Sequence, residues 1–212
     1  MKDTFKNKIL NFTNTLNIRP SHTLSISLTK NTDTNIFLFG LSKDTNISEE
    51  FYDNNKLYIN ISGKIMIDNE ELKKYDSILF FNSSYAIKAI ENSHLIEITF
   101  DEEEDMINID KKGEIFNLKD CIEYIDGGIA NFDLVSRDDL KIVLMAFDEN
   151  EGLSPHSAPG DALILALEGE AEVMVENKVS KIKEGEQIIF PKDKIHNVTA
   201  LSKFKMALIL VK

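Results

Sequence analysis

Two of the four histidines, His156 and His196, lie within Gly152–Ala200, a stretch in which glycine and proline separate short apolar runs. An imidazole ring can coordinate a divalent metal, exchange hydrogen bonds or carry a proton near neutral pH. If neighbouring strands bring the two rings together, the pair could hold a metal weakly or bind a small polar ligand without one. The structural alternative is that each ring only bonds a nearby loop, as buried histidines commonly do.

Asp161 is the carboxylate that we consider as a third metal ligand beside these histidines. Strand alternation points its side chain away from the interior of a barrel, so a ligand role would require a local bulge. Its place after Pro-Gly also suits a turn residue whose carboxylate accepts bonds from backbone N–H groups. We favour the turn role.

The composition excludes several classes of partner. The chain has 212 residues, of which 42% are hydrophobic, and a net charge of −12. This excess of acid argues against a nucleic acid or an anionic membrane as partner, since both attract clustered Lys and Arg. The first residues lack a secretory apolar run and no stretch approaches about 18 apolar residues, so we expect a cytoplasmic protein. The single cysteine, Cys121, permits no internal disulfide and is expected to be structural and at least half-buried.

Short β-rich segments recur at intervals of about 8 to 12 residues, separated by Gly, Asn and Asp, which is typical of an all-β sandwich or barrel. The strands expected in the first half are Leu24–Thr29, Ile36–Leu41, Leu57–Ile61, Lys64–Ile67, Ile78–Phe81 and Leu95–Phe100. Those expected in the second half are Ile142–Phe147, Leu163–Leu167, Ala171–Val175, Gln187–Phe190, Asn197–Ala200 and Lys205–Val211.

An internal repeat relates the two halves, because residues of the same type recur at a nearly constant offset. The matched pairs are Leu57 with Leu163 and Gly63 with Gly169, at an offset of 106, and Phe81 with Phe190, at 109. A short change in loop length explains the drift. The repeat predicts two barrels of one topology in tandem.

The join between the barrels is expected near residue 110, within a charged segment that begins with the acidic run at 101–105. This gives an N-terminal domain of residues 1–110 and a C-terminal domain of residues 111–212. Each domain is expected to begin with one short helix, at 5–12 and at 116–124, where the apolar spacing suits a single turn or two.

The strand at 162–167 is apolar on both faces, with leucine at every second position. Both faces must therefore be covered. Packing of the leucine face on the equivalent face of the other barrel, within the chain or across a dimer, would cover it. We accordingly predict a homodimer or a tight intramolecular pair.

The first of two motifs in the C-terminal half resembles a motif of the cupin superfamily, whose members are small jelly-roll barrels. In that family it runs from a glycine through His-x-His and a glutamate to a closing glycine. His156 matches the first histidine and Gly169 the closing glycine. The second histidine position is Ala158, the glutamate position is Ala162, and the opening glycine position is Asn150.

The second cupin motif runs from a glycine through Pro-x-Gly and a histidine to an asparagine. Gly185, Pro191 and His196 match it at the expected spacings. The internal glycine position is Asp193 and the asparagine position is Ala200. The chain thus resembles a bicupin, similar to small proteins of the cupin-2 conserved-barrel type. The resemblance implies an all-β fold of two tandem jelly-roll barrels, the first of them degenerate.

For function, the resemblance implies a cupin-type small-molecule-binding protein that acts on or senses a small polar metabolite such as a sugar acid. The residues expected to line its site are His156, Ala158, Ala162, Ile164, Phe190, His196 and Met206. The resemblance also leaves open whether one divalent ion, Fe, Mn, Ni or Zn, is bound. Its ligands would be His156 and His196, with Asp161 as a weaker candidate. The alternatives are a metal-dependent enzyme of the dioxygenase or sugar isomerase type and a structural or partner-binding module.

The N-terminal half keeps no histidine at the motif positions. The positions that match His156, Ala158 and Ala162 are filled by Glu50, Tyr52 and Lys56. The position of His196 is expected at Ala86 or Ile87. His22 and His94 fall outside the motif and are expected on the surface. We therefore predict a structural role for this barrel and no metal bound in the manner of the family.

Overall fold

The computed structural model is built almost wholly of antiparallel strands. It describes residues 1–29, 34–101, 107–108 and 113–212. Within these ranges the helices are limited to η1 (Asp3–Phe5) and α1 (Phe12–Thr15), each a single turn. No helix of the described part of the chain has the length and apolar character needed to cross a membrane. The all-β fold class is confirmed.

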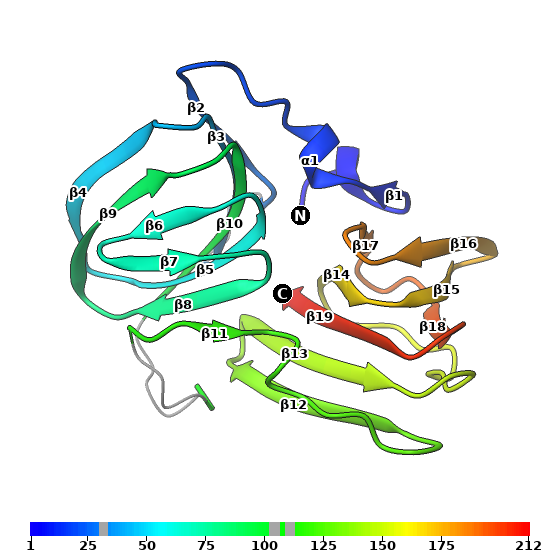
Figure 1. The fold of residues 1–212 in the computed structure, drawn as a ribbon. Coiled ribbons are helices and arrows are strands. Elements are labelled where there is room, and N and C mark those ends of the chain that lie inside the picture. Colours follow the sequence, from blue (N-terminus) through cyan, green and yellow to red (C-terminus); the bar gives the residue numbers. More distant parts are fainter. Residues whose placement is uncertain (30–33, 102–106, 109–112) are drawn as a thin grey trace. The chain divides into compact units, whose positions relative to one another are not determined.

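The chain divides into two compact units, drawn in Figure 1. We call the described residues 12–101 and 113–117 the N-terminal barrel, and residues 1–11, 107–108 and 118–212 the C-terminal barrel. The first eleven residues of the chain thus belong to the second barrel. A single boundary near residue 110, as expected from the sequence, does not allow for this. The expected boundary near residue 110 lies outside the described residues.

The N-terminal barrel consists of a six-stranded and a four-stranded sheet, in the orders β11-β8-β5-β10-β3-β2 and β4-β9-β6-β7. Its strands are β2 (Thr23–Ser27), β3 (Asn35–Leu41), β4 (Asn46–Tyr52), β5 (Asn55–Ser62), β6 (Ile65–Ile67), β7 (Glu70–Leu72), β8 (Asp76–Phe80), β9 (Ser83–Ala89), β10 (Ser93–Phe100) and β11 (Phe116–Asn117). Buried side chains of both sheets form one apolar cluster, as expected of a closed double sheet.

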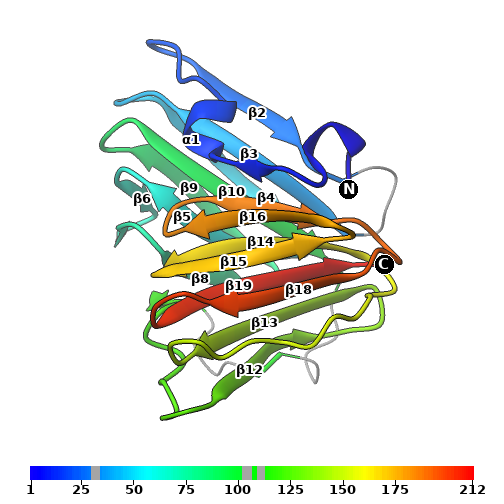
Figure 2. The same cartoon turned by 90° about the vertical axis from the view of Figure 1, so that its right-hand side faces the viewer.

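The C-terminal barrel has a six-stranded sheet, β1-β17-β14-β19-β13-β12, and a three-stranded sheet, β16-β15-β18. Its strands are β1 (Ile9–Leu10), β12 (Ile129–Ser136), β13 (Leu140–Phe147), β14 (Asp161–Glu168), β15 (Glu170–Val175), β16 (Lys178–Lys183), β17 (Gln187–Phe190), β18 (His196–Ala200) and β19 (Phe204–Val211). Figure 2 shows β14, β19 and β13 side by side, as their pairing requires. Both sheets again contribute to one apolar cluster.

The pairing registers confirm that the two barrels repeat one topology. Lys56 lies opposite Phe80, and Ala162 lies opposite Phe190. The counterpart of Phe190 is therefore Phe80, not the expected Phe81. The loop change between the repeats is one residue longer than the sequence comparison indicated.

The expected lead-in helices are wrong in extent. Residues 5–12 contain the strand β1 and only touch η1 and α1 at their ends. Residues 116–124 begin with β11 and continue as turns. The apolar spacing in both segments serves edge pairing, since Ile9 pairs with Ile188 and Phe116 with Ser77.

The side chains of β14 alternate between two faces of the sheet, as expected. Ala162, Ile164 and Ala166 belong to the apolar cluster of the C-terminal barrel. Leu163 and Leu165, on the other face, are 0% and 2% exposed. Coverage of both faces is thus confirmed, while the oligomeric state stays a prediction.

Candidate functional site

The two histidines of the cupin-like motifs lie side by side in the C-terminal barrel. His196 begins β18, and His156 lies in the loop between β13 and β14, between two prolines that keep it out of a regular strand. The two residues bond each other through their main chains, with His156 N–H to the His196 carbonyl at 3.0 Å and His196 N–H to the His156 carbonyl at 2.8 Å. Their ring centroids are 4.6 Å apart.

The hydrogen bonds of the rings decide which nitrogen faces a ligand. Nδ1 of His156 lies 2.8 Å from the Ser154 carbonyl, and Nδ1 of His196 lies 2.8 Å from the Lys194 carbonyl. A carbonyl oxygen only accepts, so each Nδ1 carries the proton and each neutral ring keeps its lone pair on Nε2. The pair therefore offers two acceptors, which suit ligand hydroxyl groups or a metal ion. We call this arrangement the imidazole pair.

The two rings differ in environment. His196 is 3% exposed and stacks on Phe190 with 4.5 Å between ring centroids, whereas His156 is exposed. Burial lowers the pKa of His196; the Lys194 carbonyl opposes this shift and the neighbouring His156 adds to it. His196 is therefore neutral at physiological pH, as an acceptor must be.

The apolar residues expected around the site are brought together. Ala162, Ile164, Phe190 and Met206 belong to one buried cluster, and Ala158 packs against it. Alanine at 158 and 162 removes two ligand positions of the family from this wall. Phe190 of this cluster stacks on His196, so the buried ring of the imidazole pair lies against an apolar side chain.

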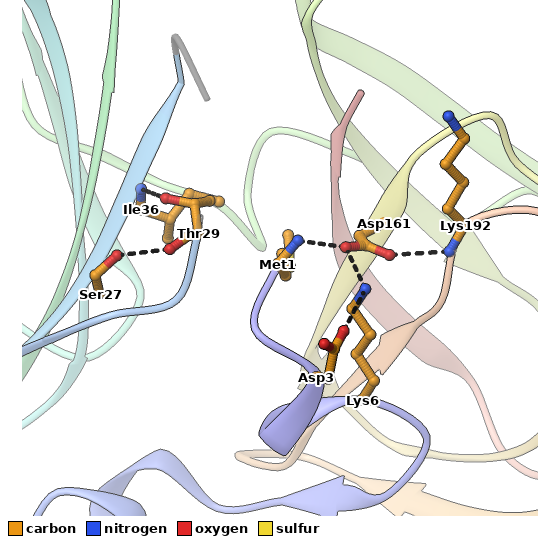
Figure 3. A network of polar contacts seen from close by, with 8 residues as sticks. All are labelled: Met1, Asp3, Lys6, Ser27, Thr29, Ile36, Asp161 and Lys192. Atoms are coloured by element: carbon orange, nitrogen blue, oxygen red, sulfur yellow. Dashed lines mark hydrogen bonds and ion pairs between the residues drawn. The ribbon is translucent and has the colours of Figure 1, made fainter. Parts of the chain in front are cut away.

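Asp161 is engaged elsewhere, as Figure 3 shows. Its carboxylate contacts the N-terminal ammonium of Met1, pairs with Lys6 Nζ at 2.7 Å and accepts the Lys192 N–H at 2.9 Å. Burial alone would raise the pKa of this carboxyl, but these bonds outweigh burial and lower the pKa. The bond from Lys192 is of the backbone type that the turn role predicts; the two cationic partners come from residues far away in sequence.

The donor set does not fit a resident metal held as cupins hold one. No group of three or more His, Cys, Asp or Glu side chains placed to bind a metal occurs in the described ranges. An ion at the imidazole pair would have to complete its coordination with water or a ligand. Its affinity would depend on that second molecule.

Two glycine positions of the motifs keep their backbone conformation without glycine. Asn150 has φ of 68° and Asp193 has φ of 60°. Asn and Asp adopt this left-handed region more readily than other side chains because they bond locally. The loops that carry His156 and His196 therefore adopt left-handed turns at these two positions without glycine.

The N-terminal barrel places a tyrosine where the C-terminal barrel has His196. Glu50 lies opposite Tyr85 in β4 and β9, as His156 lies opposite His196. The counterpart of His196 is therefore Tyr85. The expected Ala86 or Ile87 is wrong because the connection that follows Phe80 is one residue shorter than the connection that follows Phe190.

The remaining histidines behave differently from each other. His22 is exposed, as expected. His94 is 5% exposed, so the expected surface position is wrong. Nε2 of His94 lies 2.8 Å from the Leu16 carbonyl and Nδ1 lies 2.9 Å from Ser62 Oγ. This ring links residue 16 to the sheet, an arrangement that the local sequence gives no sign of. Cys121 is half-buried, as expected.

Sequence reasoning missed a polar cluster inside the N-terminal barrel. Tyr58 donates to Glu97 at 2.7 Å and bonds Tyr85 at 3.0 Å, and Lys56 pairs with Glu97 at 3.0 Å. A signal was present, because strand alternation places Lys56 and Tyr58 on the inward face and Glu97 within a strand that is otherwise apolar at its centre.

Comparison with known proteins gives a family. The family described as "Cupin domain" matches residues 143–212. A structure described as a cupin 2 conserved barrel domain protein from Leptotrichia buccalis is 33% identical, with a TM-score of 0.85, over 97% of this chain and 96% of that chain. A salicylate 1,2-dioxygenase from Pseudaminobacter salicylatoxidans, 10% identical with a TM-score of 0.66 over 88% of this chain and 76% of that one, shares the fold. No curated protein matches. The chain belongs to the cupin superfamily.

Proposed function

We propose that the protein is a bicupin that binds a small polar molecule at the imidazole pair of its C-terminal barrel. The observation that carries the proposal is the pairing of two rings whose Nδ1 atoms face carbonyls, so that Nε2 of each ring is the nitrogen available as an acceptor. Hydroxyl groups are the natural partners of such acceptors. The ligand class is therefore a polyhydroxylated metabolite, with a sugar acid as one member.

The proposal does not require a divalent metal. Two imidazoles without a third protein ligand support weak binding at most, because Fe, Mn, Ni and Zn sites that keep their metal have three or four protein ligands. The dioxygenase alternative rests on fold likeness at 10% identity, and fold does not imply function. We therefore place direct ligand binding ahead of metal-dependent catalysis. A cytoplasmic location and a homodimer remain predictions from sequence.

The test uses protein purified without chelator, analysed for metal and then titrated separately with Zn²⁺, sorbitol and D-gluconate. The variants are His196→Ala and, as control, His22→Ala. His22 is a suitable control because it is a lone exposed ring whose Nδ1 also meets a carbonyl, that of Pro20 at 2.7 Å.

The proposal predicts metal-free protein that binds one of the two polyols, with binding lost in His196→Ala and kept in His22→Ala. Stoichiometric metal that disappears in His196→Ala would instead favour the metal-dependent enzyme. Neither metal nor polyol binding would favour the structural or partner-binding module.

A further inference from the structure

The interior of the N-terminal barrel holds a lysine where the C-terminal barrel has a methyl group. Lys56 lies opposite Phe80 in β5 and β8, and its counterpart Ala162 lies opposite Phe190 in β14 and β17. The side chain of Lys56 is 10% exposed. An ammonium group so nearly removed from water is costly unless it is paired and bonded.

The ammonium of Lys56 meets two groups that attract cations. Nζ lies 3.0 Å from Glu97 Oε1 and 4.2 Å from the centre of the Tyr52 ring. Both lie within the range for an ion pair and for a cation over an aromatic face. The arrangement is that of a cation-binding site composed of a carboxylate and an aromatic ring.

A chain of two tyrosine hydroxyls holds Glu97 in position through hydrogen bonds. Glu97 also accepts a bond from the Tyr58 hydroxyl at 2.7 Å, and the Tyr58 and Tyr85 hydroxyls are 3.0 Å apart. Burial raises the pKa of Tyr58 and of Tyr85, so both stay neutral hydroxyls. Tyr85 in turn stacks on Phe80, with ring centroids 4.1 Å apart, and lies 5.0 Å from Tyr52.

We propose that Lys56 is the built-in ligand of the N-terminal barrel: its tethered ammonium fills a cation site formed by Glu97 and Tyr52, and this barrel is closed to diffusible ligands. Without the lysine head group, the same site would bind a short primary alkylammonium. This inference concerns the N-terminal barrel alone and does not depend on the function proposed for the imidazole pair.

The test removes the Lys56 side chain and supplies a free alkylammonium in its place. Lys56→Ala removes three methylene groups, Cγ, Cδ and Cε, together with the ammonium. n-Propylammonium has three carbons and an ammonium, so it matches the part of the side chain beyond Cβ. Thermal unfolding is measured with and without n-propylammonium chloride at matched ionic strength, with 1-propanol as the neutral probe of similar size. The control variant is Lys64→Ala, which breaks a surface pair with Glu71 in the same barrel.

Tyrosine signals report on this barrel selectively. The protein contains no tryptophan and five tyrosines, of which Tyr52, Tyr58, Tyr75 and Tyr85 lie in the N-terminal barrel. Near-ultraviolet circular dichroism therefore follows its unfolding. We expect n-propylammonium to raise the Tm of Lys56→Ala by about 2 °C or more, and to leave Lys64→Ala and the wild type unchanged. 1-Propanol should give no increase.

Absence of an ammonium-specific increase in folded Lys56→Ala would overturn the proposal. If Lys56→Ala does not fold, Lys56→Met and the double variant Lys56→Met with Glu97→Gln decide. These keep the side-chain volume and remove first one charge and then both. Recovery of Tm in the double variant relative to Lys56→Met supports the cation site, and no recovery overturns it.

Discussion

The interiors of the two barrels carry opposite kinds of side chain at matching positions. Register matches place Lys56 with Ala162, Tyr58 with Ile164, Glu97 with Leu208 and Tyr85 with His196. One interior is thus bonded to itself through charges and hydroxyls, and the other is apolar beside two unprotonated ring nitrogens. The same framework of strands and turns, which we call the shell, surrounds either interior. In our two proposals the interior is the part that decides which barrel accepts a ligand.

The largest expected effect is loss of the buried charge pair. Glu97→Ala leaves Lys56 without its counterion in a site where both side chains are 10% exposed, and should lower the free energy of unfolding of the N-terminal barrel by about 3–5 kcal/mol. The matched variant Leu208→Ala removes only apolar contacts of a half-buried side chain and should cost about 2 kcal/mol. Urea unfolding followed by hydrogen exchange separates the two barrels. Equal costs would remove the contrast between the interiors.

The shell, in contrast, should respond equally in both barrels. Gly63 and Gly169 have φ of 73° and 74°, and a Cβ at either would collide with a main-chain carbonyl, that of Asn92 or Lys203. Alanine at each position should cost about 2–3 kcal/mol through clash and strain. The same hydrogen-exchange measurement applies. A difference well above 1 kcal/mol between the two variants would show that the shells are less alike than their registers indicate.

Within the imidazole pair the two rings should differ. His196→Ala removes a buried ring stacked on Phe190 and should cost about 1–2 kcal/mol, while exposed His156 should change stability by no more than about 0.5 kcal/mol when replaced by alanine. Urea midpoints at pH 7.5 provide the measurement. A large loss in His156→Ala would assign that residue a structural role and weaken its assignment to a ligand.

Acid should weaken both barrels slightly. Burial lowers the pKa of His94 and of His196, so the unfolded chain takes up these protons first, near pH 6.5. Each histidine therefore contributes stability that is complete above about pH 6.5 and is lost as the pH falls from there towards the lowered pKa. The loss between pH 7.5 and 5.5 should be below about 1 kcal/mol per barrel. His94→Gln should abolish it in the N-terminal barrel only; an unchanged pH slope there would contradict the assignment.

The sequence was sufficient for the shell and insufficient for the interior. Glycine turns and strand alternation are local patterns, and they predicted most of the strands. The repeat predicted the two barrels, and the resemblance of the two motifs indicated the family. The edge strands β4, β12 and β16 were missed, because few of their side chains are buried and their apolar alternation is weak. A one-residue difference in the connections that lead into β9 and β18 hid the true counterpart of His196.

Partners far apart in the chain were beyond sequence reasoning altogether. Asp161 binds Lys6, and His94 bonds the carbonyl of Leu16. Neither pairing follows from spacing, because closure of the barrel alone brings these residues together. The imidazole pair itself was predictable, since both histidines stand at recognisable motif positions; the direction of each ring was not.

The tautomers of His94, His156 and His196 test the central contrast most directly. Long-range ¹H–¹⁵N correlation spectra at pH 7.5 report which ring nitrogen carries the proton. We predict Nδ1–H for His156 and His196, which leaves Nε2 as the acceptor, and the opposite tautomer, Nε2–H, for His94, whose Nε2 donates to a carbonyl. An Nε2–H or doubly protonated ring at His156 or His196 would contradict the account, because the C-terminal barrel would then offer no pair of acceptors to a ligand.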